Sequence, residues 1–304
     1  MDFESAFKII ESVLVRDSRR GAMSLADLVQ GDLKAAVTSI VNTVDRHIVI
    51  VTGFNVPTPL GPTPETDGPV GAAALAAACL AIGARVSVVT DSPCASVVRA
   101  ALRGYGGLES IPVLVAQSPS CEHEIAVVDL VKKFEKGTSH VVFIERPGIA
   151  ADGTYRSMAG IVLEDVACLD ALVGLDGAFV IGIGDGGNEV GMGKLPSTAI
   201  SSAVEHGLKI ASVTSCDALI VSAVSNWGAF GLAALVLALS APTGLNQFAP
   251  LDLTAHRASL LATVGAGAID GVTGEHTESV DGYQWDVYVQ VLQAILTITE
   301  FAGR

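Results

Sequence analysis

Two hydrophobic patterns alternate along the chain from residue 47 onward: short β-branched runs and longer alanine-rich stretches. The short runs predict strands and the longer ones predict helices, because strands commonly span about 4–8 residues and helices about ten or more. The expected strands lie near 47–51, 85–89, 139–144, 177–182 and 209–214. The expected helices lie near 70–83, 93–103, 122–135, 165–173, 197–206, 227–239, 252–264 and 284–300. Such alternation is typical of βαβ units, so we expect an α/β fold with a mainly parallel sheet and helices on both faces.

The beginning of the chain follows a different pattern. Apolar residues recur at helical spacing over 3–14 and again over 25–41, so residues 1–45 predict a helical N-terminal element. The sequence contains no fixed-period repeat, low-complexity tract or evident linker. We therefore expect residues 1–304 to form a single α/β domain.

Composition narrows the range of partners. Half of the residues are hydrophobic, aromatic residues make up only 5%, and the mean hydropathy is +0.53. The longest apolar stretches, 69–84 and 227–241, are shorter than the roughly 20 residues that span a bilayer, so we expect buried helices and no membrane segment. The net charge of −14, from 32 acidic and 18 basic residues, would repel nucleic acid. Formation of a homo-oligomer stays open.

The N-terminal residues and the cysteines indicate the cellular compartment in which we expect the protein. Asp2 and Glu4 stand where a targeting peptide would be basic, so we expect neither export nor import. The five cysteines are widely spaced and include no Cys-x-x-Cys pair, and we interpret them as buried, reduced side chains. Both observations favour a cytoplasmic protein.

Four polar loops interrupt this apolar chain, over 52–69, 145–155, 182–194 and 270–282. The first three follow predicted strands, and the fourth lies between the last two predicted helices. In open parallel sheets, ligands bind beyond the carboxyl ends of the strands. We therefore expect the four loops to meet at one end of the sheet and to form a single site.

The 182–194 loop is the most informative, because residues 182–193 hold six glycines around Asp185, Asn188 and Glu189. Glycine lets the backbone approach a ligand closely. The two carboxylates and the amide suit either a substrate ammonium group or a hard cation such as Mg²⁺, and we favour the ammonium group. The alternative is structural: Asp185 caps a following helix and Glu189 is solvated.

The same loop matches the fingerprint of a dinucleotide-binding loop, as Gly182-x-Gly184-x-x-Gly187. That fingerprint normally follows the first strand of the sheet, whereas this match comes late in the chain and beside two acids. A nucleotide-dependent enzyme is therefore kept only as an alternative.

Two further loops offer groups that suit an anion. Arg146 can clamp a substrate carboxylate, or it can form a structural ion pair with Glu145. Asp67-Gly-Pro69 fits the start of a helix whose free backbone N–H groups point toward the pocket.

Six motifs occur in order along the chain. They are Thr52-Gly-Phe54, Glu65-Thr-Asp67-Gly-Pro69, Glu145-Arg-Pro147-Gly, Ala151-Asp152-Gly153-x-Tyr155, Gly182-Ile-Gly-Asp185-Gly-Gly-Asn188-Glu189-x-Gly191-Met-Gly193 and Ser225-Asn226-Trp227-Gly228. Together they resemble the C-terminal domain of the D-glutamate cyclase family, over roughly residues 45–300. The resemblance implies a lyase that converts a small acidic substrate, D-glutamate, to 5-oxo-D-proline with loss of water.

Ring closure of this kind requires a base for the α-ammonium group, a group that stabilises the developing oxyanion, and an acid for the leaving oxygen. Asp185 or Glu189 can act as the base and Asp67 as the acid. Arg146 and the backbone N–H groups of 184–187 can stabilise the oxyanion. No cofactor is required, and a divalent cation such as Mg²⁺ held by Asp185 and Glu189 is the alternative.

The catalytic candidates are thus Asp185, Glu189 and Asp67. The substrate-binding candidates come from the loops and motifs named above: Thr52, Gly53, Glu65, Arg146, Asp152, Gly184, Gly186, Gly187, Asn188, Lys194, Asn226 and Asp270. The alternative to an enzyme is a non-catalytic binding or regulatory domain for an acidic amino acid.

Overall fold

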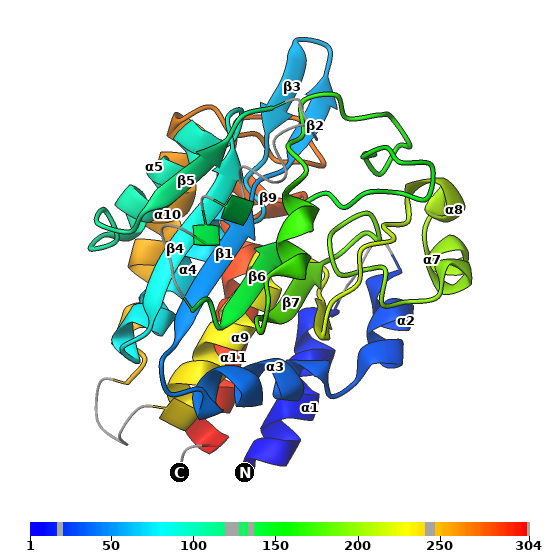
Figure 1. Ribbon diagram of the computed structural model, residues 1–304. Coiled ribbons are helices and arrows are strands. Elements are labelled where there is room, and N and C mark those ends of the chain that lie inside the picture. The colour runs from blue at the N-terminus through cyan, green and yellow to red at the C-terminus, as the bar shows by residue number, and fades with distance from the viewer. Residues whose placement is uncertain (17–20, 119–127, 130, 133–136, 241–246, 303–304) are drawn as a thin grey trace.

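The computed structural model describes residues 1–16, 21–118, 128–129, 131–132, 137–240 and 247–302. Six strands form its central sheet: β1 (His47–Thr52), β4 (Arg85–Asp91), β5 (Val113–Ala116), β6 (His140–Ile144), β7 (Phe179–Gly184) and β8 (Ala218–Val221). Their spatial order is β5-β4-β1-β6-β7-β8, and every neighbouring pair is parallel (Figure 1).

The strand order defines where a ligand is expected. Counted in chain order within this sheet, the strands follow 3-2-1-4-5-6, which is a doubly wound arrangement. The winding reverses between β1 and β6, and such sheets bind ligands beyond the carboxyl ends of these two strands. The predicted α/β fold with a mainly parallel sheet is confirmed.

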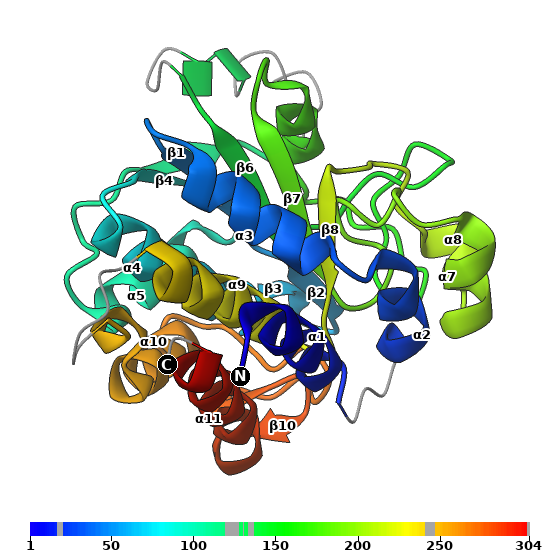
Figure 2. The ribbon, with the colours of Figure 1, turned by 90° about the horizontal axis from the view of Figure 1, so that it is seen from below.

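The sheet is buried on both faces, because β1 directs Ile48 and Ile50 into one apolar cluster and Val49 and Val51 into another. The first face carries two layers of helices, which lie together on one side of the strands in Figure 2. The inner layer comprises α4 (Pro69–Ala81), α5 (Ala95–Tyr105) and α9 (Ser225–Ser240), and the outer layer comprises α1 (Phe3–Leu14), α10 (Leu253–Gly265) and α11 (Trp285–Ala302). Because α4 and α9 are enclosed between the sheet and the outer helices, they are apolar nearly all round.

Shorter elements complete the fold. On the second face, the 3-10 helix η3 (Leu169–Gly174) packs Leu169 and Leu172 into the cluster that contains Val49 and Val51. The helix α3 (Asp32–Asn42) contacts β8 and α9. The remaining elements are α2 (Ala22–Ala26), η1 (Asp27–Val29), α7 (Ser197–Ala203), α8 (Gly207–Ile210), η4 (Ala249–Leu251), β9 (Ser279–Val280) and β10 (Tyr283–Gln284).

The N-terminal element is helical as predicted, but its second helix is interrupted. The helix expected over 25–41 is divided into α2, η1 and α3. Gly31 adopts φ 95 immediately before α3, and this left-handed conformation cannot continue a helix.

Two predicted elements differ in the structure. The strand expected over 209–214 is wrong, because residues 207–210 form α8 and the sixth strand of the sheet is β8. The continuous apolar run of β8 suits a strand buried on both faces better than the mixed run before it. The helix expected over 165–173 is the shorter η3, and the helix expected over 122–135 lies outside the described residues apart from 128–129 and 131–132.

A hairpin of β2 (Asn55–Thr58) and β3 (Gly61–Pro64) extends beyond the carboxyl end of β1 (Figure 1). In its register Pro57 faces Pro62. Proline cannot donate to a strand ladder, so the sequence predicted a stiff loop here rather than strands.

Two further expectations can be compared with the structure. Across the described residues, no helix combines the length and the apolar character needed to cross a membrane. Cys79, Cys94 and Cys216 are free thiols as predicted. Cys168 is disulfide-bonded, so the prediction of a reduced side chain is wrong for this residue, since sequence spacing does not show which cysteines the fold brings together.

Candidate active site

Six carboxylates converge beyond the carboxyl ends of β1, β6 and β7. All are at most 7% exposed, and we call them the acid cluster: Glu65, Asp67, Glu145, Asp185, Glu189 and Asp281. Carboxylate oxygens of Asp67, Asp185 and Asp281 lie within 4.8 Å of one another, as do those of Glu145, Asp185 and Glu189. The four polar loops therefore meet, as predicted, at the point where the winding of the sheet reverses.

Glu189 holds the glycine loop together. Its Oε1 accepts hydrogen bonds from the backbone N–H groups of Asp185 at 3.1 Å and Gly186 at 2.7 Å, and its Oε2 accepts one from Gly187 at 2.7 Å. The expectation that these N–H groups stabilise an oxyanion is therefore wrong, because Glu189 already engages them. Position 184 requires glycine, since a Cβ there would lie 2.9 Å from Glu189 Cδ.

Asp67 and Asn226 cap two helices reciprocally. Asp67 stands before α4, yet its carboxylate accepts hydrogen bonds from the backbone N–H groups of Ser225 and Asn226, both at 2.8 Å, at the start of α9. Asn226 Oδ1 in turn accepts from Gly68 at 2.9 Å and Gly71 at 2.6 Å, at the start of α4. The predicted helix start is confirmed, but its N–H groups bind Asn226, which corrects the expectation that they are free for an anion.

Like charges dominate the electrostatics of the acid cluster. Burial and then the negative charge of Asp281 raise the pKa of Asp67 to about 8. Burial, followed by the charges of Glu189 and Asp185, raises the pKa of Glu145 well above its ordinary value. A positive group among these carboxylates would therefore be strongly favoured.

Two members of the cluster have backbones in the left-handed region. Glu145 has φ 44 and Asp281 has φ 52, conformations that cost about 1–3 kcal/mol each and concentrate at functional sites. Ser225 Oγ donates a hydrogen bond of 2.6 Å to Glu145 Oε2, and Asp270 Oδ2 accepts one of 2.8 Å from the backbone of Gly282, next to Asp281. Ser225 thus fixes the carboxylate of Glu145, and Asp270 fixes the backbone beside Asp281.

Arg146 is a structural cation. Its side chain is buried, Nη1 lies 2.8 Å from Asp91 Oδ2 and 2.9 Å from the carbonyl oxygen of Gly53, and Nη2 donates to the carbonyl oxygen of Ala167 at 2.7 Å. The ion pair is therefore with Asp91 and not with Glu145, and the expected clamp on a substrate carboxylate is wrong. Instead, Arg146 fixes Gly53 directly after β1.

Three other candidates make their contacts outside the acid cluster. Lys194 Nζ lies 2.5 Å from Asp32 and 2.7 Å from the carbonyl oxygen of Asp217. The exposed side chain of Asp152 pairs with Arg156. Asp270 accepts from the backbone of the 272–273 turn and of Gly282, so it shapes a loop and carries Asp281 without joining the cluster.

A cavity of about 180 Å³ opens beside the acid cluster. Glu65, Glu145 and Asn188 are its charged and amide-bearing lining residues, and the remainder of the lining is Phe54, Val56, Pro57, Ser157, Met158, Ala159, Ile161 and Gly271. Gly271 leaves room for the Glu65 carboxylate, because a Cβ there would lie 2.1 Å from Glu65 Oε2. The volume suits a small metabolite, since it lies below the roughly 300–1,000 Å³ of pockets for drug-sized ligands.

Two buried oxygens beside the cluster have no hydrogen-bond partner among the described residues: Asn188 Oδ1 and Thr52 Oγ1. Asn188 Nδ2 donates to the carbonyl oxygen of Arg156 at 2.8 Å, and this bond assigns the amide orientation that leaves Oδ1 available. Thr52 Oγ1 lies 2.6 Å from the position that a Cβ on Gly68 would occupy. Each of these oxygens can accept a hydrogen bond from a ligand or from a water molecule.

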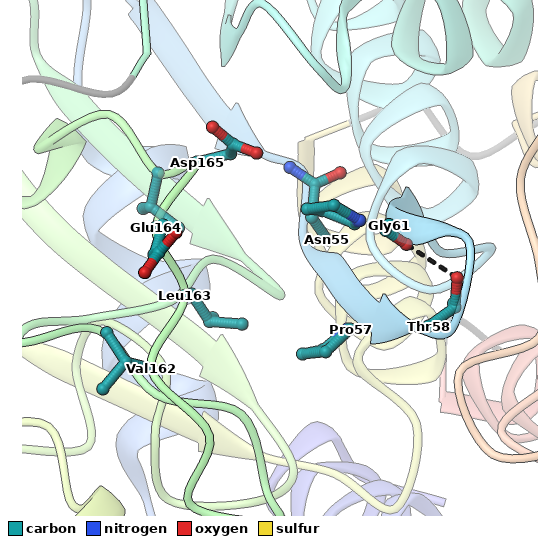
Figure 3. A pocket seen from close by; sticks show the side chains of 10 residues that line it. Asn55, Pro57, Thr58, Gly61, Val162, Leu163, Glu164 and Asp165 are labelled. Atoms are coloured by element: carbon teal, nitrogen blue, oxygen red, sulfur yellow. Dashed lines mark hydrogen bonds between the residues drawn. The ribbon is translucent and has the colours of Figure 1, made fainter.

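A second cavity, of about 210 Å³, lies between the hairpin and residues 162–166. Figure 3 shows Asn55, Pro57 and Thr58 of the hairpin on one side of it and Val162 to Asp165 on the other. Pro57 lines both cavities, so the two adjoin at strand β2.

Sequence reasoning missed two members of the cluster as site residues. Glu145 directly follows β6, so the rule that predicted the loop also pointed to this residue, but it was interpreted only as a partner of Arg146. Asp281 follows a two-residue strand and lies within the predicted 270–282 loop, but no motif singled it out.

Fold and site together define a doubly wound α/β protein with a buried acidic site at the switch point of its sheet. A model of the D-glutamate cyclase-like, C-terminal family matches residues 10–296, so the chain belongs to this family, as the motifs predicted. Human "D-glutamate cyclase, mitochondrial" is 35% identical over 200 residues, which cover 62% of this chain and 32% of the human protein. The aligned segment thus spans about a third of that relative.

Proposed function

We propose that the protein cyclises D-glutamate to 5-oxo-D-proline with release of water. The observation that carries the proposal is the small cavity whose charged lining consists of Glu65 and Glu145, in a chain of the D-glutamate cyclase-like family. An amino acid entering this cavity would place its ammonium group against those carboxylates. The human relative, named D-glutamate cyclase, supports this choice of substrate.

The proposed roles follow from which groups face the cavity. The α-ammonium group gives up one proton before its nitrogen attacks the γ-carboxyl carbon and a second as the amide forms. Both protons reach the carboxyl oxygen whose C–O bond breaks, and that oxygen leaves as water. Glu145 carries the proton, because it lines the cavity and Ser225 fixes its carboxylate. Asn188 Oδ1 accepts a hydrogen bond from the substrate nitrogen and holds it for attack.

The earlier catalytic candidates take other positions in this scheme. Glu189 and Asp67 each accept three backbone hydrogen bonds, so they support the loop and the helix starts. Asp185 belongs to both sets of converging carboxylates, and in this scheme it lies next to the reacting centre. The reaction uses no redox cofactor or nucleotide.

Chiral chromatography of the purified protein with D-glutamate tests the proposal. We expect 5-oxo-D-proline to form in buffer that contains Mg²⁺ and Mn²⁺ but no NAD, ATP or flavin. Glu145→Gln should lower the rate by about 100-fold or more, because it removes the proton carrier, and should leave the melting temperature unchanged or raised.

The control variant is Asp152→Asn, which changes an exposed carboxylate and should keep the wild-type rate. If no 5-oxo-D-proline forms but D-glutamate raises the melting temperature, the protein is a non-catalytic binding domain for this amino acid and not an enzyme. A melting temperature raised only by NAD or ATP would favour the nucleotide-dependent alternative.

A further inference from the structure

We propose that the cavity between the hairpin and residues 162–166 binds a small aliphatic amine that also carries a neutral oxygen, such as an amino amide. The cavity has a volume of about 210 Å³, and no member of the acid cluster lines it, so it is a second site beside the first. Its charged lining residues are Glu164 and Asp165. Neither of them forms a hydrogen bond or an ion pair with another described residue, so both carboxylates are available to a cation.

Asn55 supplies an observation that is independent of these charges. The residue is only 3% exposed, and its Oδ1 accepts a hydrogen bond of 3.4 Å from the thiol of Cys94. This bond assigns the orientation of the amide and leaves Nδ2 without an acceptor among the described residues. Figure 3 shows this nitrogen on the side of Asn55 that faces Asp165 across the cavity. A ligand oxygen in the cavity would satisfy this buried donor.

Both walls of this cavity are held by hydrogen bonds. On the hairpin side, Thr58 Oγ1 donates to the carbonyl oxygen of Gly61 at 2.6 Å (Figure 3). On the other side, the backbone N–H of Leu163 donates to the carbonyl oxygen of Tyr155 at 2.9 Å, and the two side chains belong to one apolar cluster. A cavity with fixed walls loses little conformational entropy when a ligand enters it.

The lining groups define the chemical class of the ligand. An ammonium group would meet the carboxylates of Glu164 and Asp165, and an oxygen close to it would accept a hydrogen bond from Asn55 Nδ2. Val162 and Leu163 offer apolar surface to an aliphatic body. A dicarboxylate such as glutamate is disfavoured here, because its charge has the same sign as that of the lining.

A titration of the full chain with leucinamide, followed by ¹H–¹⁵N nuclear magnetic resonance, tests the site. Leucinamide combines an ammonium group, a neighbouring amide oxygen and a branched aliphatic body. We expect saturable shifts of the backbone N–H signals of Gly61, Leu163 and Val166, which line the cavity. 4-Methylpentanamide lacks the ammonium group and should bind about 10-fold more weakly. 3-Methylbutylamine lacks the amide and should bind about 3-fold more weakly or less tightly still.

Two variants separate the two contacts. Asp165→Asn should weaken the binding of leucinamide about 10-fold and leave that of 4-methylpentanamide unchanged, because this probe has no ammonium group. Asn55→Ala should weaken the binding of leucinamide and leave that of 3-methylbutylamine unchanged. The control is Asp152→Asn, which changes an exposed carboxylate that does not line the cavity and should bind leucinamide as the wild type does.

If Asn55→Ala does not fold, Asp165→Asn carries the test, since the Asp165 side chain has no partner to lose among the described residues. Wild-type protein whose signals at Gly61, Leu163 and Val166 do not shift overturns the proposal. An Asp165→Asn variant that binds leucinamide as tightly as wild type also overturns it. The measurement contains no D-glutamate and changes no residue of the acid cluster, so its outcome is independent of the proposed cyclisation.

Discussion

At the residue scale, four carboxylates of the acid cluster divide into two kinds according to their surroundings. Glu189 and Asp67 are held by backbone N–H groups, whereas Glu65 and Glu145 face the cavity. The sequence could predict that acids in these loops meet, because strand ends of a parallel sheet meet. It could not predict that Glu189 turns back onto its own loop, since this depends on the backbone path through the glycines.

Replacement of Glu189 tests its supporting role. Glu189→Ala should lower the free energy of unfolding by roughly 3–5 kcal/mol, because three buried N–H groups lose their acceptor. Glu189→Gln keeps one acceptor oxygen and should lose less. Chemical denaturation measures both values. A Glu189→Ala variant of wild-type stability that has lost only activity would restore Glu189 as a catalytic residue.

At the element scale, the pairing of α4 with α9 depends on the reciprocal caps of Asp67 and Asn226. The Ala-rich patterns predicted both helices, and Pro69 indicated the start of the first. Sequence proximity could not indicate that each helix is capped by a residue about 158 positions away. The hairpin and the interrupted N-terminal helix were missed for local reasons. Prolines conceal the strands of the hairpin, and the left-handed conformation of Gly31 ends the helical run.

The stability contributed by the buried helix cap Asn226 can be compared with that of an exposed helix cap, Asp252. Asn226→Ala should lower the free energy of unfolding by roughly 2–4 kcal/mol, because the buried N–H groups of Gly68 and Gly71 lose their acceptor. Asp252→Ala removes the exposed cap of α10 and should cost about 1 kcal/mol. Chemical denaturation of the two variants gives the comparison. Equal losses would show that Asn226 contributes no more than a surface cap.

At the scale of the whole molecule, the alternation of strands and helices was enough to predict a parallel sheet and the end at which its site lies. The order of the strands was not predicted, since it depends on which way each crossover turns along the sheet. β5 and β8 are only four residues long, and neither was predicted as a strand. They nevertheless form the two edges and complete the doubly wound order.

Three buried histidines should make the stability of the whole fold depend on pH. Burial lowers the pKa of His47 and His140 to about 4 and that of His256 to about 3. In the unfolded chain the three imidazoles become protonated as the pH falls below about 6.5, whereas in the folded protein they stay neutral to a lower pH. The folded protein therefore keeps its full stability with respect to these groups above about pH 6.5 and loses it as the pH falls toward 4. The raised pKa of Asp67 acts in the opposite direction, because its contribution falls as the pH rises toward 8.

The variant His140→Gln separates the pH effect of a buried histidine from that of Asp67. His140→Gln keeps a side chain able to bond Ser39 and Ser139 but does not titrate. We compare the free energy of unfolding of the variant minus that of wild type at two pH values. This difference should be larger at about pH 4.5 than at about pH 7.5 by roughly 2–3 kcal/mol, because only the wild type is destabilised by protonation of His140 in the unfolded chain. Urea denaturation at the two pH values measures this difference, and the contribution of Asp67 cancels because both proteins contain it. A difference that stays constant with pH would mean that His140 accepts a proton in the folded protein as readily as in the unfolded chain.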